Sequence, residues 1–345
     1  MDLNTIWFVL VGVLIAGYGV LDGFDLGVGV LHLFARSEEE RLVHVKAIGP
    51  VWDGNEVWLL TGGGALFAAF PAVYATVFSG LYLALMLLLV ALIARAVSLE
   101  YRHQLEGARW RRFWDFAFGI GSLVPALLFG VAVGNVLRGV PVGAGGEWQG
   151  TFPGLLNPYA LLVGLVTLTF FTMHGAVFLR MKAEGALAER LARWTLPLWG
   201  AFAALFVAAT AASAEVSPWL FDDLTSSPLR IVLAIALAAS LVAVPALSRA
   251  GRTGAAFVAS SATMVTTVFC AAASAYPRLV PSSVDLAYSL TAYNAASSHT
   301  TLTVMLVVAL VGMPLVIGYQ AFIYRVFRGK VSPASEGYGT VRAVQ

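Results

Sequence analysis

Cysteine and charged residues are scarce in this chain of 345 residues. Cys270 is its one cysteine, and it lies in an apolar run. A single cysteine excludes an internal disulfide, and it excludes an iron–sulfur cluster or a CxxC zinc site held by this chain alone. Charged residues make up only 12% of the sequence. The motifs GxxxxGK[ST], GxGxxG and HExxH do not occur in an appropriate setting, so we expect neither ATP nor nucleic acid as a ligand.

Long apolar runs fill most of the sequence instead. Hydrophobic residues make up 59% of the chain, and the mean hydropathy is +0.82. A helix that spans a membrane needs about 20 predominantly apolar residues. We therefore predict an all-α, polytopic membrane protein with about nine transmembrane helices. The expected spans are residues 6–34, 47–70, 74–98, 113–137, 156–180, 194–214, 229–248, 255–277 and 300–325.

The basic residues predict how these spans are oriented. Nearly all Lys and Arg lie in residues 35–46, 99–112, 181–193, 249–254 and after Tyr324. Cytoplasmic loops carry the excess of Lys and Arg, so we place the N-terminus outside and the C-terminus in the cytoplasm. We predict one transmembrane domain over residues 1–331 and a polar cytoplasmic tail over residues 332–345. The longest outer loops, residues 139–155 and 278–299, are expected to be ordered.

Two acidic pairs interrupt the first two spans. Asp22 and Asp25 lie in GYGVLDGFDLGVGVL, and Asp53 and Glu56 lie in GPVWDGNEVWLLTGGGALFAAFP. Each pair is three residues apart, so its members share one face of a helix. An ionisable group inside a membrane helix costs roughly 2.5–3.5 kcal/mol on insertion scales, so packing alone rarely explains it. The four acids indicate a polar path for protons or cations.

Each pair also has a simpler explanation. The glycines around Asp22 and Asp25 allow close helix packing, and these acids could pair with Arg36 or Arg41 near the cytoplasmic interface. Asp53 and Glu56 could favour the start of a helix through its dipole. Trp52, Asn55 and Trp58 add hydrogen-bonding and aromatic groups beside the second pair.

Two further charged residues and one histidine complete the set of candidates. Arg95 lies deep enough in the third span to pair with one of the four acids, and snorkelling to the interface is the alternative. Asp115 is expected to be an interfacial acid at a helix start. His174 is the one histidine within a span, and no second axial ligand is evident. We expect His174 to be a hydrogen-bonded interior residue and this chain to ligate no haem or other metal.

Three segments carry a family resemblance: the two acidic motifs and SLTAYNAASSHTTLTVML strongly resemble subunit II of cytochrome bd-type quinol oxidases. RWRRFWDFAFGIGSLVPALLFGVAVGNVLRGVP is also similar to that family. The WDGNEVW block is the most specific part, and the resemblance runs from the first span to the ninth.

The resemblance implies a subunit of a terminal oxidase in the bacterial inner membrane, which oxidises ubiquinol or menaquinol and reduces oxygen to water in aerobic respiration. It implies a heterodimer with a haem-bearing subunit I, which would hold two b-type haems and one d-type haem. This chain would bind no haem, stabilise subunit I and contribute to a cytoplasmic proton route. Small accessory subunits and a structural quinone are left open.

The resemblance also assigns acids to the proton route. By position it implies Asp22 or Asp25, Asp53 and Glu100. We add Glu56 because it lies beside Asp53, and we expect support from Trp52, Asn55, Trp58 and Arg95. No catalytic residue is expected in this chain.

Two other functions remain open from the residues alone. The first is a stand-alone proton- or cation-coupled transporter, for which the glycines at positions 62–64 would mark a broken span. The second is a purely structural subunit, whose acids would form only interchain salt bridges.

Overall fold

The computed structural model describes residues 2–222 and 225–333. The described residues are mostly helical. The α-helices are α1 (Leu3–His32), α2 (Glu38–Ile48), α3 (Trp52–Ala69), α4 (Pro71–Gly80), α5 (Tyr82–Tyr101), α6 (Ala108–Arg138), α7 (Pro158–Lys182), α8 (Gly185–Val216), α9 (Pro228–Arg249), α10 (Thr253–Ala275) and α11 (His299–Val326). The short elements are η1 (Pro153–Leu156), η2 (Pro218–Phe221), β1 (Arg278–Val280), η3 (Leu286–Tyr288) and β2 (Leu290–Thr291).

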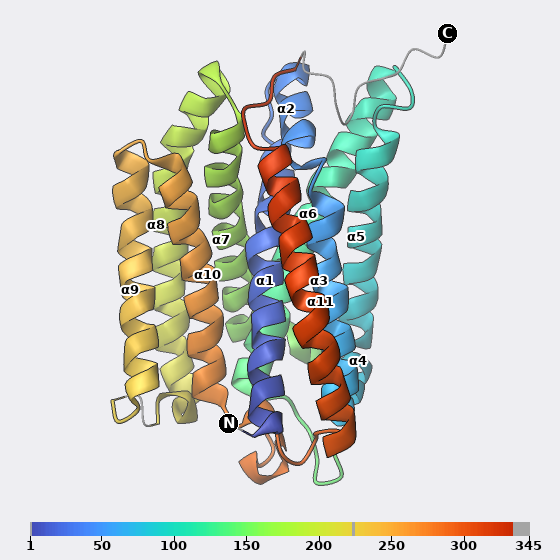
Figure 1. Cartoon of the computed structure of the whole chain (residues 1–345), viewed down its shortest axis with the longest axis vertical. Helices are drawn as coiled ribbons and strands as arrows, with labels where there is room; N and C mark the ends of the chain where they lie inside the picture. The colour runs from blue at the N-terminus through green and yellow to red at the C-terminus, as the bar shows by residue number, and fades with distance from the viewer. Residues whose placement is uncertain (1, 223–224, 334–345) are drawn as a thin grey trace.

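The long helices stand side by side in one bundle, with α8, α9 and α10 on one flank and α3, α4 and α5 on the other (Figure 1). Helix α1 lies between the flanks and packs against α3, α6, α7, α10 and α11. The N-terminus lies at the end of the bundle opposite to α2 and to the last described residues (Figure 1). The first and the last described residues therefore lie at opposite ends of the bundle.

Eight described helices are long and apolar enough to cross a membrane, namely α1 and α5 to α11. The predicted span 47–70 corresponds to α3, which has 18 residues and carries Asp53, Asn55 and Glu56. Helix α3 packs along α1 but is not among the eight, so nine spans stay a prediction. Helix α3 is continuous through residues 62–64, so these glycines do not mark a broken span.

The prediction of one continuous helix over residues 74–98 is wrong. Helix α4 ends at Gly80, and α5 begins at Tyr82. A Cβ atom on Gly80 would lie 2.1 Å from the ring of Trp148, which belongs to the loop after α6. The break therefore depends on a tight contact with a distant loop, and no proline marks it in the sequence.

The segment before the second span forms a helix rather than a loop. Residues 38–48 form α2, and the backbone N–H of Glu40 donates to the Ser37 hydroxyl at 3.2 Å. Three consecutive glutamates, Glu38 to Glu40, occupy the first turn, where negative charge interacts favourably with the helix dipole.

Glycine allows α1 and α7 to touch through their backbones. A Cβ atom on Gly27 would lie 1.8 Å from the carbonyl oxygen of Phe171, and one on Gly175 would lie 2.5 Å from the carbonyl carbon of Gly27. Any side chain there would force the two helices apart. The expected close packing around the acids of the first span is therefore present.

The two long outer loops are ordered and contact each other, as expected. Strand β1 pairs with β2 in an antiparallel manner, and Val140 forms a bridge with Ser282. The Ser282 hydroxyl donates to the carbonyl of Val142 at 2.7 Å. Of the expected polar tail, residues 334–345 lie outside the described residues.

Candidate functional site

A group of buried and half-buried polar side chains lies where α1, α3, α5 and α11 meet. We call it the α1 polar cluster. Its members are Asp22, Asp25, Asn55, Arg95, Gln320 and Tyr324. Asp22, Asp25, Asn55 and Arg95 are each 0% exposed, so their polar groups depend on partners inside the protein.

Asp22 and Arg95 form a two-pronged ion pair between α1 and α5. Arg95 Nη1 donates to Asp22 Oδ2 at 2.9 Å, and Arg95 Nη2 donates to Asp22 Oδ1 at 2.5 Å. This confirms the predicted pairing of Arg95 with one of the four acids. Snorkelling of Arg95, the alternative, is wrong because its side chain has no exposed surface.

The pairing of Asp22 or Asp25 with Arg36 or Arg41 is not what the structure shows. Helix α1 continues for ten residues beyond Asp22, to His32, which places Asp22 roughly 15 Å from the end of the helix. Arg41 lies instead against Asp115, at 3.5 Å between Nε and Oδ2.

Asp25 belongs to a chain of neutral hydrogen bonds rather than to an ion pair. Asn55 Nδ2 donates to Asp25 Oδ2 at 2.7 Å and to the carbonyl of Leu21 at 3.2 Å. The Asn55 carbonyl oxygen accepts from Gln320 Nε2 at 2.6 Å and from the Tyr324 hydroxyl at 3.0 Å. Asp25 Oδ1 is buried and has no hydrogen-bond partner among the described residues.

The α1 polar cluster thus contains two carboxyl groups and one guanidinium group. Asp22 holds that guanidinium with both oxygens, whereas Asp25 contacts a neutral amide. Asp25 can therefore change its protonation state without breaking an ion pair. Sequence reasoning missed Gln320 and Tyr324, because a single Gln and a single Tyr near the end of an apolar helix carry no local signal.

The remaining predicted acids lie around this cluster rather than in it. Glu56 is half-buried, and its charge interacts with Arg95, Asp22 and Asp53. Asp53 is exposed in the first turn of α3. Glu100 is exposed near the end of α5, five residues beyond Arg95.

The two supporting tryptophans pack against α1 and within a buried apolar cluster. A Cβ atom on Gly17 would lie only 2.4 Å from the ring of Trp58. Helices α1 and α3 therefore approach closely there. Trp52 is buried in a core cluster with Val51 and Leu99. Both residues therefore hold α3 against its neighbours.

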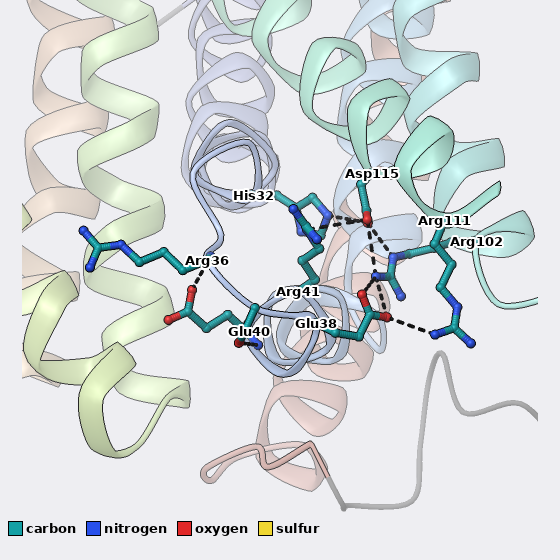
Figure 2. A network of polar contacts seen from close by, with 9 residues as sticks. His32, Arg36, Glu38, Glu40, Arg41, Arg102, Arg111 and Asp115 are labelled. Atoms are coloured by element: carbon teal, nitrogen blue, oxygen red, sulfur yellow. Dashed lines mark hydrogen bonds and ion pairs between the residues drawn. The ribbon is translucent and has the colours of Figure 1, made fainter. Parts of the chain in front are cut away.

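A second group of charges joins α2 to α1, α5 and α6 (Figure 2). We call it the α2 ion network. Its members are His32, Glu38, Arg41, Arg102, Arg111 and Asp115. The carboxylates and guanidinium groups point toward one another across the gap between α2 and α6 in Figure 2.

Asp115 is the centre of the α2 ion network. It accepts from Arg102 Nε at 2.5 Å, and His32 Nε2 lies 2.8 Å from its Oδ1. Arg102 also reaches Glu38 at 2.9 Å, and Arg111 lies 3.6 Å from Glu38. The expectation of an interfacial helix-start acid is wrong in one respect: Asp115 lies near the start of α6, but it is buried by the helices that supply its cations.

Helix α2 supplies one further ion pair and a buried histidine. Glu40 accepts from both terminal nitrogens of Arg190 on α8, at 2.9 and 2.6 Å. Burial raises the pKa of Glu40, but the hydrogen bonds from Arg190 and from the backbone of Arg36 outweigh it, so this pKa lies below its ordinary value. His44 is fully buried, and burial together with the nearby charge of His32 and Arg190 holds its pKa well below the ordinary value.

His174 is a hydrogen-bonded interior residue, as predicted. Its Nδ1 lies 2.7 Å from the Ser260 hydroxyl, and its Nε2 lies 3.1 Å from the carbonyl of Val20. A carbonyl can only accept, so Nε2 carries the proton and donates to Val20. Phe257 stacks on the ring with a centroid distance of 4.7 Å. Both ring nitrogens are therefore engaged.

Among the described residues, no group of three or more His, Cys, Asp or Glu side chains is arranged to hold a metal ion.

Comparisons with known proteins point in one direction. A family model described as cytochrome bd terminal oxidase subunit II matches residues 3–327. The chain is 39% identical to cytochrome bd-I ubiquinol oxidase subunit 2 of Escherichia coli, over 96% of this chain and 95% of that protein. It is 37% identical to cytochrome bd ubiquinol oxidase subunit 2 of Bacillus subtilis, over 96% of this chain and 97% of that protein.

A solved structure shares the fold. A chain of the bd oxidase from Geobacillus thermodenitrificans superposes with a TM-score of 0.76 at 20% sequence identity, over 95% of this chain and 99% of that chain.

Proposed function

The chain belongs to the cytochrome bd terminal oxidase subunit II family, and from this membership we propose that it is the haem-free second subunit of a complex that oxidises quinol and reduces oxygen to water. The relatives from Escherichia coli and Bacillus subtilis are ubiquinol oxidase subunits, so the complex is a quinol:oxygen oxidoreductase. The full-length match to the family is the observation that carries the proposal.

The haems are assigned to the partner, subunit I, with two of b type and one of d type. His174 supports that assignment. Both of its ring nitrogens are hydrogen-bonded. A haem ligand needs an imidazole nitrogen with an available lone pair facing the iron, so His174 fits an interior role better.

The face formed by α3 and α11 is proposed to dock on subunit I. The two helices are neighbours, and α11 has only 6% of its most apolar window buried. Asp53, Thr61 and Gly64 are exposed on α3. A polar side chain at membrane depth needs protein or water rather than lipid, so a protein partner suits this face better than acyl chains.

The α1 polar cluster is proposed to carry protons from the cytoplasmic side toward that partner. Oxygen reduction to water consumes one proton for each electron, so the complex needs such a route. Asn55 of α3 donates to Asp25, Glu56 beside it is half-buried, and Asp53 is exposed in the first turn of the same helix. Asp25 can exchange a proton while Arg95 stays paired with Asp22. Glu100 is a further candidate at the cytoplasmic end of α5.

A visible absorption spectrum tests the assignment of the complex and of the haems. The complex would be solubilised gently and purified through a tag on this chain. We expect reduced-minus-oxidised bands of b- and d-type haem together with a second large polypeptide, and a colourless chain once the subunits are separated. A colourless single protein would contradict the oxidase subunit, and haem retained by the separated chain would contradict its haem-free role.

Charge movement in proteoliposomes tests the proton route. The complex would be reconstituted with wild-type chain or with Asp53→Asn, and quinol-driven turnover and membrane potential would be recorded together. A slower turnover with less charge moved supports Asp53 as a route residue. Unchanged turnover and charge movement would remove Asp53 from the route.

A further inference from the structure

Tyr324 joins the α1 polar cluster to a cavity at the α2 end of the bundle. The cavity has a volume of about 270 Å³, and the Tyr324 side chain forms part of its lining. The Tyr324 hydroxyl donates to the side-chain oxygen of Asn55 at 3.0 Å, and Asn55 Nδ2 donates to Asp25 Oδ2 at 2.7 Å. One side chain therefore reaches from the cavity to a hydrogen-bond partner of the buried Asp25.

The cavity has room for water and adjoins the solvent. The centre of one water molecule needs roughly 10–15 Å³, so a cavity of this size has room for several. Lys46 and Lys182 contribute polar groups to its lining. Arg328, Gly329 and Lys330 also line it, and all three are exposed. Water that enters from this end of the bundle therefore finds polar partners inside the cavity.

The segment after α11 forms one wall of the cavity and is held in place by hydrogen bonds. Lys182 Nζ donates to the carbonyl of Phe327 at 2.5 Å, and the backbone N–H of Val331 donates to the carbonyl of Lys182 at 2.8 Å. Lys46 Nζ donates to the carbonyl of Pro333 at 2.8 Å. These bonds tie the segment to α2 and α7, beside which it passes in Figure 1. The cavity is therefore a built part of the fold.

Asp25 has one oxygen that none of the described residues engages. Oδ2 accepts from Asn55, whereas Oδ1 is buried without a hydrogen-bond partner in the described part of the chain. A buried polar oxygen without a partner costs free energy, so Oδ1 marks a place for a proton or a water molecule. The amide of Asn55 is not an ionisable group, so Asn55 fixes the position of Asp25 but does not deliver a proton. Delivery from this side then depends on water from the cavity.

Two donors share the side-chain oxygen of Asn55, and they differ in their other contacts. Gln320 Nε2 donates at 2.6 Å, and the Tyr324 hydroxyl donates at 3.0 Å. Tyr324 lines the cavity, and Gln320 is not part of the lining. One donor satisfies a buried carbonyl oxygen, so Gln320 alone can keep Asn55 in place. The bond from Tyr324 can therefore open without releasing Asn55 from Asp25.

We propose that Tyr324 is a gate between the cavity and Asp25, and this proposal rests on the proton route proposed above. With its hydroxyl on Asn55 the gate is closed, and the ring keeps cavity water away from Asp25. When the hydroxyl leaves Asn55, the ring moves and water reaches Asp25 Oδ1, while Gln320 holds Asn55. Tyr324 is thus a positioning residue that controls access of water and carries no proton itself.

A purely structural role for Tyr324 is the main alternative. Its ring packs edge-on against Phe24 with a centroid distance of 6.4 Å, and it lies against the apolar core cluster that contains Leu179. In a structural role the hydroxyl would serve only to hold Asn55. Loss of the shorter bond from Gln320 would then disturb Asn55 at least as much as loss of the Tyr324 hydroxyl. The two explanations differ in how Tyr324→Phe and Gln320→Met compare.

Access of a small thiol reagent to position 25 tests the gate in the purified two-subunit complex. The reporter is Asp25→Cys, labelled with methanethiosulfonate ethylammonium and followed by peptide mass spectrometry, with the half-buried Cys270 as the internal reference. Tyr324→Phe keeps the ring but removes the hydroxyl. We expect Asp25→Cys/Tyr324→Phe to be labelled about fivefold faster than Asp25→Cys, the factor that one neutral hydrogen bond represents. The matched control is Asp25→Cys/Gln320→Met, which removes the other donor and should be labelled at the rate of Asp25→Cys.

A second comparison keeps the native Tyr324. Val51 lines the cavity, so Val51→Cys lies on the outer side of the gate. The open form of a gate is a minor state, populated at roughly 0.1–10%. We therefore expect Val51→Cys to be labelled at least about tenfold faster than Asp25→Cys.

The outcomes separate the gate from the proton route. The gate is overturned if Tyr324→Phe does not speed the labelling of Asp25→Cys, if Gln320→Met speeds it equally, or if Val51→Cys and Asp25→Cys are labelled at the same rate. Asp25→Cys has no carboxyl group, so these rates do not depend on the proton route, which proton uptake by Asp25→Asn tests by itself. Normal uptake in Asp25→Asn together with faster labelling in Tyr324→Phe would contradict the route and support the gate. Slowed uptake with unchanged labelling would support the route and contradict the gate.

Discussion

The α1 polar cluster and the α2 ion network are both built from acids and arginines, but their charges are balanced differently. In the α2 ion network Asp115 and Glu38 are surrounded by three arginines and one histidine. In the α1 polar cluster two buried acids share one arginine, and Asp25 is left with neutral partners. An excess of cations holds helices in place, whereas an acid without its own cation is free to take up and release a proton. The difference agrees with a structural role for the α2 ion network and with the proton route proposed for the α1 polar cluster.

Arg95→Gln should have the largest effect. It leaves Asp22 buried without its cation, and breaking a buried ion pair in this way costs about 3–5 kcal/mol. We expect a large fall in the yield and the melting temperature of the detergent-solubilised complex. Arg109→Gln, at an exposed position, is the control. The double variant Asp22→Asn/Arg95→Gln should recover much of the loss, and a double variant no better than Arg95→Gln would contradict the ion-pair explanation.

Arg102→Gln tests the structural role of the α2 ion network. It removes the bonds from Arg102 to Asp115 and Glu38, and hydrogen bonds to charged groups are each worth about 1.5–3 kcal/mol. His32 and Arg41 remain beside Asp115, so the loss should be smaller than for Arg95→Gln. The melting temperature should fall while turnover per assembled complex stays unchanged. A selective loss of proton uptake at normal stability would mean that the network also conducts protons.

Asp25→Asn should separate function from stability in the α1 polar cluster. The new amide oxygen can still accept from Asn55, so we expect a change in unfolding free energy within about 1 kcal/mol. Turnover should fall on the order of tenfold, about 1.4 kcal/mol in activation free energy, because the exchangeable carboxyl group is gone. Stopped-flow proton uptake on oxygen addition to the reduced complex would measure it. Normal uptake would show that the route bypasses Asp25.

The smallest effect is expected from pH, through His44 beside the α2 ion network. The charged or titratable groups that face it are His32 of α1, Arg41 of α2, Arg190 of α8 and Asp115 of α6. Its pKa in the folded protein lies well below the ordinary value, so below about pH 6.5 the unfolded chain binds a proton that the folded chain does not. Stability from this residue is therefore complete above that pH and falls as the pH drops, by at most about 1.4 kcal/mol per pH unit.

Melting temperatures between pH 7.5 and pH 5.5 would check this pH dependence. The variant His44→Phe, which cannot titrate, should show a flatter profile than the wild type. Equal slopes for the two would assign the acid sensitivity to other groups.

The sequence was sufficient to predict much of the bundle and half of the α1 polar cluster. Charge inside an apolar helix is costly, so Asp22, Asp25 and Arg95 stood out, and their contacts are as buried as that cost requires. Asn55 was noticed only as a neighbour of Asp53, yet it is the residue that joins three helices. The cost of a buried charge reveals that a partner exists, but it does not reveal which helix supplies it.

The features that were missed depend on contacts between distant residues. Asp115 looked interfacial because only its place near a helix start is local, whereas its burial comes from α1, α2 and α5. The break after Gly80 depends on Trp148, 68 residues later. Helix α2 was read as a basic connecting segment because its composition is too polar for a membrane span. In each case the tertiary partner, not the local pattern, sets the structure.

The contacts of Asn55 also have a consequence for biosynthesis. The Asp22–Arg95 pair can form once α5 has entered the membrane, because both residues lie in the first third of the chain. The donors to the Asn55 carbonyl oxygen come from α11, 265 and 269 residues later. An unsatisfied polar group in the bilayer costs several kcal/mol, so a nascent or truncated chain carries a defect that only the last helix repairs. Arrival of α11 therefore removes this defect, and membrane proteases have a physical basis for telling a chain with α11 in place from one without it.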